Sequence, residues 1–262
     1  MTYGLIGKQL DYSFSRKYFT EKFRLHNLSH RYLNFELTQV SEYPSLVQLH
    51  ADLAGCNVTI PYKQAIIPYL SDLDPTARSV GAVNTIVFSS KKHTATLVSR
   101  AGSQITSIGY NTDVIGFAKA LSLLLQGQRP THSYILGTGG AAQAVSWVLA
   151  KAEHAHTFVS RNPSATQLGY QRLQEVIAPG SLIVNTTPLG TSPHVDAMPP
   201  VSESVLRAAG FVFDLIYNPA ETLLLRKARA AGCRTLNGLP MLEEQAEASW
   251  RLWNANAVDL HD

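Results

Sequence analysis

A run of three glycines and two alanines is the clearest candidate for chemistry in this sequence. The motif Gly137-Thr-Gly-Gly-Ala-Ala142 follows a short apolar run and precedes an alanine-rich segment, residues 143–152, that we predict to be a helix. A strand, a glycine turn and a helix in this order bind the pyrophosphate of a dinucleotide, because Gly137 allows the tight turn and Gly139 the close backbone approach. The helix N-terminus adds unpaired N–H groups. A tight turn that binds no ligand has the same pattern, so the motif alone is a weak signal.

The residues after the next predicted strand indicate which dinucleotide is bound. That strand, residues 156–159, ends at Ser160-Arg-Asn162. Enzymes that use NAD place an Asp or Glu about twenty residues after the glycine turn, where it binds the ribose hydroxyls. This sequence has Arg161 there and no carboxylate, and a guanidinium donates charged hydrogen bonds to a 2′-phosphate that a carboxylate would repel. The pattern therefore predicts NADP in preference to NAD, with an ordinary surface arginine as the alternative.

Polar side chains in the first half of the chain lie at the ends of predicted elements. Lys63 follows a predicted strand, residues 57–60, and begins a predicted helix, where its charge opposes the helix dipole and gains no local stability. That placement favours a chemical role, although a solvated lysine fits as well. Asp113 precedes a long predicted helix and could serve as its N-terminal cap. Ser13 and Ser15 follow the first predicted strand, where hydroxyls bind a polyol or carboxylate, or cap a helix.

Predicted strands and helices alternate along the chain, which indicates an α/β fold with parallel sheets covered by helices. We expect two domains, with a Rossmann-type nucleotide-binding domain threaded into an N-terminal substrate-binding domain, and ligands bound at the carboxyl ends of the strands. The predicted boundaries are residues 1–113 plus 239–262 for the substrate domain and 114–238 for the nucleotide domain. The last helix, with Trp250 and Trp253 as core residues, should return to the first domain.

The polar segment 89–103 is predicted to be an extended hairpin with an extra strand at 94–98. We expect it to form an addition to the first domain.

Composition excludes several classes of protein. The 262 residues are 45% hydrophobic and 16% charged, and the net charge of +3 is spread along the chain, so neither a nucleic-acid partner nor a basic arm is expected. Cys56 and Cys233 are far apart, which indicates a reducing compartment and neither a disulfide scaffold nor a metal site. No apolar run approaches the length that spans a membrane, and the N-terminus has no signal peptide, so we expect a cytoplasmic protein.

Seven motifs, taken together, resemble the shikimate dehydrogenase family. They cover nearly the whole chain in the order found in that family, and Asn-Val-Thr-x-Pro-x-Lys and Asn-Thr-Asp are highly specific to it. The seven motifs are Ser13-x-Ser15, Asn57-Val-Thr-Ile-Pro-Tyr-Lys63, Gly81-Ala-Val-Asn-Thr85, Tyr110-Asn-Thr-Asp113, Gly137-Thr-Gly-Gly-Ala141, Asn185-x-Thr-Pro-x-Gly190 and Gly238-x-x-Met-Leu-x-x-Gln245.

The resemblance implies the two-domain fold, NADP as cofactor, and the reversible reduction of 3-dehydroshikimate to shikimate by a monomer or homodimer. It implies that Lys63 and Asp113 are catalytic and flank the reacting carbonyl. The implied substrate-binding residues are Ser13, Ser15, Thr59, Lys63, Asn84, Asp113, Tyr217 and Gln245. The implied cofactor-binding residues are Gly137, Thr138, Gly139, Gly140, Ala141, Ser160, Arg161, Asn162, Thr186, Leu215 and Gly238.

The sequence also departs from the family pattern. Lys8 and Gln9 stand where a Pro usually follows the first glycine, and Tyr12 and Arg16 replace the usual His and Pro of the serine loop. Ser160 replaces the Asn that usually precedes the arginine. Two alternatives stay open: a sister enzyme that acts on quinate or an amino analogue or uses NAD, and a non-catalytic NADP-binding regulator, which we would expect to lack the catalytic lysine or aspartate.

Overall fold

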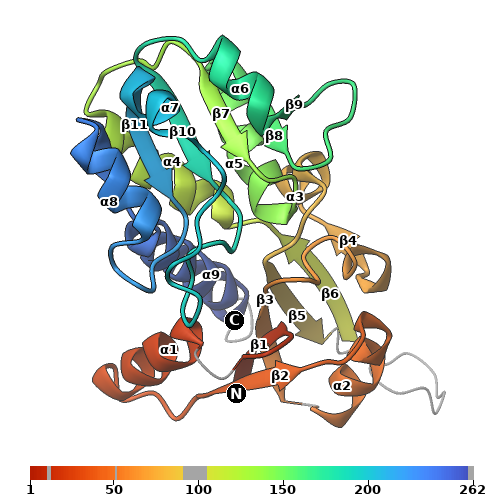
Figure 1. Cartoon of the computed structure of the whole chain (residues 1–262). Coiled ribbons are helices and arrows are strands. Elements are labelled where there is room, and N and C mark those ends of the chain that lie inside the picture. Colours follow the sequence, from red (N-terminus) through yellow and green to blue (C-terminus); the bar gives the residue numbers. More distant parts are fainter. Residues whose placement is uncertain (11–12, 51, 91–104, 259–262) are drawn as a thin grey trace, which may run out of the picture. The chain divides into compact units, whose positions relative to one another are not determined.

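The computed structural model describes residues 1–10, 13–50, 52–90 and 105–258, and the chain forms two compact units (Figure 1). The first unit comprises Met1–Thr112 and Ala246–Asp262, and the second comprises Asp113–Gln245. Within the described residues, none of the helices combines the length and apolar character needed to cross a membrane. The predicted strand at 94–98 lies outside the described residues.

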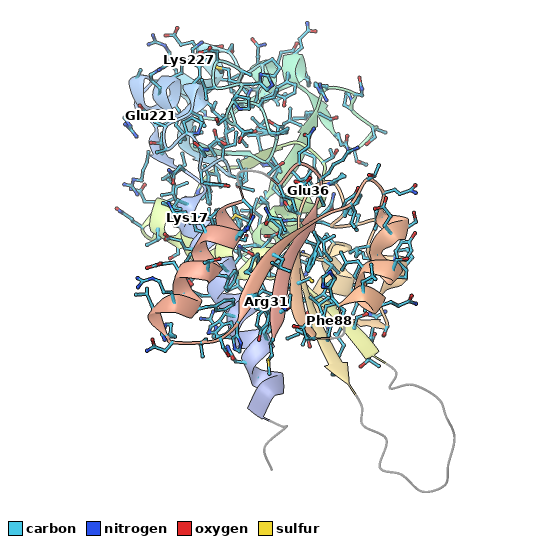
Figure 2. All side chains as sticks on the ribbon, turned by 90° about the horizontal axis from the view of Figure 1, so that it is seen from below. Lys17, Arg31, Glu36, Phe88, Glu221 and Lys227 are labelled. Carbon is cyan, nitrogen blue, oxygen red and sulfur yellow. The ribbon has the colours of Figure 1, made fainter. Side chains whose placement is uncertain are left out.

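The first unit is built on a six-stranded sheet in the order β2-β1-β3-β5-β6-β4. Its strands are β1 (Thr2–Gly7), β2 (Arg31–Glu36), β3 (Leu53–Val58), β4 (Asp72–Leu73), β5 (Thr85–Ser90) and β6 (Ile105–Tyr110). Its helices are α1 (Phe14–Leu25), α2 (Tyr43–Leu49), α3 (Pro75–Val80), the 3-10 turns η1 (Val40–Glu42) and η2 (Ile67–Tyr69), and the later part of α9 (Leu239–Val258). Figure 2 labels Arg31 and Glu36, the first and last residues of the edge strand β2.

The parallel pairing expected from the order of the elements holds for only part of the first unit's sheet. β1 runs parallel to β2 and β3, but β5 runs antiparallel to both β3 and β6, with Thr85 opposite Asn57 and Tyr110. Residues 59–84 join β3 to β5 and exceed the dozen or so residues that a parallel crossover needs, so the length of the connection does not dictate the antiparallel direction. The helix that leads into β5 is α3, whose C-cap is Gly81 with φ +69°.

An aromatic core joins the C-terminal helix to the first unit. Trp253 is 3% exposed and its indole nitrogen donates to the carbonyl oxygen of Ile86 at 3.0 Å. Its ring packs against Tyr3 and Phe19, with centroids 4.9 and 5.2 Å apart. A Cβ on Gly55 would lie 2.2 Å from that indole, so the tryptophan covers strand β3 closely. The prediction that this tryptophan is a core residue is confirmed.

The second unit contains a wholly parallel sheet in the order β12-β11-β10-β7-β8-β9. Its strands are β7 (Ser133–Leu136), β8 (His156–Ser160), β9 (Leu168–Gly169), β10 (Ser181–Asn185), β11 (Ala209–Asp214) and β12 (Arg234–Leu236). Its helices are α4 (Asp113–Leu125), α5 (Gly140–Lys151), α6 (Tyr170–Val176), α7 (Glu203–Ala208), α8 (Leu223–Ala230) and the first residues of α9 (Figure 1).

Successive side chains of these strands point to opposite faces of the sheet, and helices cover both. On one face Leu136 and Val212 pack with residues of α6, α7 and α8. On the other, Phe213 stacks on Phe117 of α4 with ring centroids 5.3 Å apart. Because β8 lies on one side of β7 and β10 on the other, the direction of winding reverses at β7. Ligands of such sheets bind in the crevice at this switch point, beside the strand carboxyl ends.

Candidate functional site

The glycine turn follows β7, at the switch point of the parallel sheet. Gly137 has φ +111°, which only glycine adopts without strain, and a Cβ there would lie 2.6 Å from the Thr186 hydroxyl. Gly139 is the N-cap of α5 and has no other heavy atom within 4 Å of the position of a Cβ. The turn therefore offers open space directly in front of a helix N-terminus, which is the arrangement that binds phosphate through backbone N–H groups.

The loop after β10 is fastened beside this turn. The backbone N–H and the hydroxyl of Thr186 both donate to the carbonyl oxygen of Leu136, at 3.0 and 2.7 Å. Gly137 and Thr186, two of the predicted cofactor residues, are thus brought together by the ends of two neighbouring strands.

A buried carboxyl group anchors the loops after β10 and β11. Asp214 is fully buried and accepts hydrogen bonds from Asn185 at 2.9 Å, from Thr222 at 2.6 Å and from the Ile216 N–H at 3.2 Å. Burial raises the pKa of Asp214 to about 6, and the three hydrogen bonds oppose part of that rise. The sequence prediction did not include this residue, although an acidic residue at the end of an apolar strand is a signal for it.

Leu215 and Gly238 lie in contact at the same edge of the sheet. A Cβ on Gly238 would be 2.0 Å from the carbonyl oxygen of Leu215, and the Gly238 N–H donates to the Ile216 carbonyl at 3.0 Å. These two residues, both predicted to assist the cofactor through their backbones, are therefore adjacent.

Arg161 follows the last residue of β8 and its side chain is exposed. The preceding Ser160 closes the turn, since its hydroxyl accepts from the Asn162 N–H and donates to the Asn162 carbonyl, both at 3.2 Å. The guanidinium acts on the phenol of Tyr170, where it opposes the rise in pKa that burial causes. The turn thus holds the arginine at the carboxyl end of a strand next to the glycine turn's own strand.

The two serines of the first unit have different surroundings. The Ser13 hydroxyl accepts from the Arg16 N–H at 3.2 Å and caps α1, so the capping role considered for it is realised. Ser15 is 7% exposed, and its hydroxyl acts on the phenol of Tyr32, where it opposes the rise in pKa that burial causes. Tyr12, which occupies the place of the usual histidine, lies outside the described residues.

Lys63 does not begin a helix, so the argument from the helix dipole is wrong. Strand β3 ends at Val58, and a turn follows in which the Tyr62 N–H donates to the Thr59 carbonyl. No α-helix lies between Val58 and the 3-10 turn at Ile67–Tyr69. The two prolines of this segment, at 61 and 68, restrict the chain to turns. Lys63 is half-buried, and its carbonyl accepts from the Val83 N–H at 2.7 Å, so its backbone lies beside the segment that carries Asn84.

Asn84 is 2% exposed, and both ends of its side-chain amide hydrogen-bond Thr112. Its amide nitrogen donates to the Thr112 hydroxyl at 2.9 Å, and its amide oxygen accepts from the Thr112 N–H at 2.6 Å. Because the nitrogen donates and the oxygen accepts, these hydrogen bonds determine the orientation of the Asn84 amide.

The remaining predicted substrate residues belong to the second unit. Asp113 is the first residue of α4 and is 4% exposed, and Gln245 is 7% exposed. A Cβ on Gly116 would lie 3.1 Å from the Cβ of Gln245, so this glutamine packs against the first turn of α4. Tyr217 follows β11 and is half-buried.

Comparisons with known proteins cover both parts of the chain. A family model described as the shikimate dehydrogenase substrate binding domain matches residues 5–86. The protein named shikimate dehydrogenase (NADP(+)) from Methanococcus maripaludis is 32% identical over 273 residues, which are 98% of this chain and 93% of that protein.

Solved structures show the same fold. Shikimate dehydrogenase 1 from Peptoclostridium difficile superposes with a TM-score of 0.82 at 32% identity, over 97% of this chain and 91% of that one. Quinate dehydrogenase from Corynebacterium glutamicum, in complex with NAD, superposes with a TM-score of 0.79 at 27% identity, over 97% and 94%. Because relatives more than 30% identical match almost the full length of the sequence, the chain belongs to the shikimate dehydrogenase family.

Proposed function

We propose that the chain catalyses the reversible NADPH-dependent reduction of 3-dehydroshikimate to shikimate. One observation carries this proposal: a sequence that matches the family's substrate-binding part is continuous with a parallel sheet whose switch point presents a left-handed glycine and an open helix N-terminus. The first unit supplies most of the polar groups that suit a hydroxylated carboxylic acid, and the second supplies Asp113, Tyr217 and Gln245 together with the phosphate-binding turn.

The proposed chemistry assigns each polar group a task. NADPH supplies the hydride when it is bound. Lys63, as an ammonium, stabilises the negative charge that develops on the carbonyl oxygen and donates the proton to it. Asp113 accepts hydrogen bonds from substrate hydroxyls. We further propose that the substrate carboxylate and other hydroxyls are bound by Ser13, Ser15, Thr59, Asn84, Tyr217 and Gln245.

The residues around the glycine turn fit an NADP molecule. Open space lies at Gly139, since nothing lies within 4 Å of a Cβ there, and the backbone N–H groups at the start of α5 would bind the pyrophosphate in it. Residues 137–141 would form this site, with Gly137 making the turn. Arg161 would bind the 2′-phosphate through its guanidinium, with Thr138, Ser160 and Asn162 beside the same ligand. Thr186, Leu215 and Gly238 would line the nicotinamide end.

The division of labour follows the predicted domain boundaries. We propose that residues 1–113 and 239–262, together with Tyr217, bind the substrate and that residues 114–238 bind NADP. We also propose that the enzyme is cytoplasmic and acts as a monomer or homodimer on its small-molecule substrate.

The deciding experiment measures reduction of the nicotinamide by absorbance with shikimate and quinate, each tested with NADP and NAD. We expect the highest kcat/KM with shikimate and NADP. A preference for quinate and NAD would move the chain to the second candidate, which its structural similarity to the NAD-bound quinate dehydrogenase favours. Tight NADP binding without turnover on either acid would indicate a regulator.

The Lys63→Ala variant tests the chemical step. We expect turnover to fall by orders of magnitude while the KM for shikimate changes little, because the ammonium acts mainly in the transition state. A turnover number equal to that of the wild type would refute the role.

A further inference from the structure

Three buried hydroxyl groups meet behind Asn84 in the first unit. The hydroxyl oxygens of Thr85, Thr112 and Ser249 are separated by 2.8 Å for Thr85 and Ser249 and by 3.1 Å for the other two pairs. Their residues are at most 1% exposed. They come from β5, from the residue before α4 and from α9, which makes this triangle a junction between segments far apart in the sequence.

One assignment of hydrogens satisfies every group in the triangle. Ser249 donates to Thr85 at 2.8 Å, and Thr112 donates to Ser249 at 3.1 Å. Thr85 then donates to the amide oxygen of Asn84 at 3.2 Å. In return, the amide nitrogen of Asn84 donates to Thr112 at 2.9 Å. Buried polar networks that are complete in this way hold their members in a single arrangement.

The same network continues to Ser15. The amide nitrogen of Asn57 donates to Ser249 at 3.0 Å and to Thr85 at 3.3 Å, and its amide oxygen accepts from the Tyr32 hydroxyl at 2.8 Å. The Ser15 hydroxyl acts on the Tyr32 phenol, where it opposes the rise in pKa that burial causes. Hydrogen bonds therefore link Tyr32, beside the proposed substrate-binding Ser15, to Thr112, which holds the proposed substrate-binding Asn84.

We propose that Thr112 and Tyr32 are positioning residues for the substrate, which act by fixing the side chains of Asn84 and Ser15. This inference rests on the proposed function, because it assumes that those two side chains bind the acid. The geometry explains why the motifs of the first unit contain Asn57, Thr85 and Thr112, polar residues to which the proposed chemistry assigns no task.

The hydrogen bonds of the network predict which substitutions should have the largest effect on substrate binding. Removing the Thr112 hydroxyl takes away an acceptor of the Asn84 amide nitrogen at 2.9 Å and a donor to Ser249 at 3.1 Å. Removing the Thr85 hydroxyl leaves Ser249 a second acceptor in Thr112, at 3.1 Å. Removing the Ser249 hydroxyl leaves the Asn57 amide with two other acceptors, the Thr85 hydroxyl and the Asn84 carbonyl, each at 3.3 Å. The expected order of effect is therefore Thr112→Val, then Thr85→Val, then Ser249→Ala.

The experiment measures the KM for shikimate, the KM for NADP, kcat and the melting temperature of each full-length variant. We expect Thr112→Val to raise the KM for shikimate about tenfold, the cost of losing a buried hydrogen bond to Asn84, and to leave the KM for NADP unchanged. Thr112→Ser keeps the hydroxyl and should restore the KM to within about twofold. Tyr32→Phe should raise the same KM severalfold.

Matched controls separate positioning from stability. Thr106→Val removes a hydroxyl on β6 that bonds Ser89 at 2.7 Å, and Tyr43→Phe removes a buried phenol of the same unit, both outside the network. We expect these controls to change the melting temperature without changing the KM for shikimate.

If Thr112→Val and Tyr32→Phe lower only the melting temperature, or if Thr112→Ser fails to restore the KM, the positioning role is wrong even though the wild type turns over shikimate. If the wild type itself does not oxidise shikimate, the proposed function is wrong, and this result distinguishes that failure from a failure of the positioning role alone.

Discussion

The carbonyl oxygen of Leu215 occupies the space in which a side chain on Gly238 would begin, because a Cβ there would lie 2.0 Å from that oxygen. Real side chains do not approach backbone atoms so closely, and neither partner is a flexible side chain that can move aside. Glycine at position 238 is therefore required by the contact between the loop after β11 and the start of α9.

Gly238→Ala should destabilise the second unit. Backbone must shift to admit the methyl group, and overpacking of this kind costs about 1–3 kcal/mol. We expect a lower melting temperature together with a higher KM for NADP. Gly169→Ala is the matched control, since its Cβ would meet only a side-chain atom of Pro163 at 3.7 Å and its φ is −82°. Equal melting temperatures for Gly238→Ala and the wild type would contradict the close contact.

Gly139→Ala should separate cofactor binding from stability. No neighbour obstructs a Cβ at this position and its φ of −76° suits alanine, so the melting temperature should stay the same. The methyl group would fill the space proposed for the pyrophosphate, and we expect the KM for NADP to rise about tenfold or more. An unchanged KM would place the pyrophosphate elsewhere. Gly137→Ala, by contrast, should lower both stability and affinity, because φ is +111° and Thr186 stands in the way.

Arg161→Leu should change the preference between the two dinucleotides. Hydrogen bonds to a charged group contribute about 1.5–3 kcal/mol, so the affinity for NADP should fall by roughly 10- to 100-fold while that for NAD stays the same. Titration calorimetry or fluorescence with both nucleotides would measure this. Arg172→Leu provides the control, since Arg172 is an exposed arginine of the same unit that pairs with Glu175. A parallel loss of NAD affinity would show that Arg161 does not read the 2′-phosphate.

Asp214→Asn should alter how stability depends on pH. The pKa of this carboxyl is about 3.8 when unfolded and about 6 when folded, so the folded state favours the protonated form. The stability gained from that preference is fully present below pH 3.8 and is lost as the pH rises to about 6. Above that, the wild type carries a cost of about 3 kcal/mol that the amide variant lacks.

Urea denaturation of wild type and Asp214→Asn between pH 4 and pH 7.5 would measure this effect. As the pH rises, the free energy of unfolding of the variant should increase relative to that of the wild type. A difference that stays constant across the range would show that the carboxyl has the same pKa in both states.

Local features of the site were predictable from the sequence because a few consecutive residues determine them. The glycine turn, its helix and the arginine after the next strand need only the order of residues in one βαβ unit. The antiparallel direction of β5 was missed because the order of strands and helices along a chain does not report the direction in which a strand joins its sheet. The helix expected at Lys63 failed because the prolines at 61 and 68 leave room only for turns.

The buried hydrogen-bond network could not be predicted from neighbouring residues, because its members are far apart in the sequence. Ser249 and Thr112 are 137 positions apart, and their hydroxyls meet only once α9 packs on the first unit. Nothing in the composition around Tyr32 or Ser249 marks them as polar partners in a core. Within the motifs, however, Thr85 and Thr112 were visible as hydroxyl residues without a task, and that is the signal by which sequence reasoning could have found part of the network.

Because Trp253 fills the core of the first unit from near the far end of the sequence, the order of synthesis and the order of domain completion differ. Residues 113–245 form one uninterrupted stretch and hold all of the second unit, so every residue of that unit is made before the tryptophan. The residues made first must wait for those made last. A released chain that ends at residue 245 should therefore protect the nucleotide-binding half from protease while leaving the substrate-binding half open to cleavage.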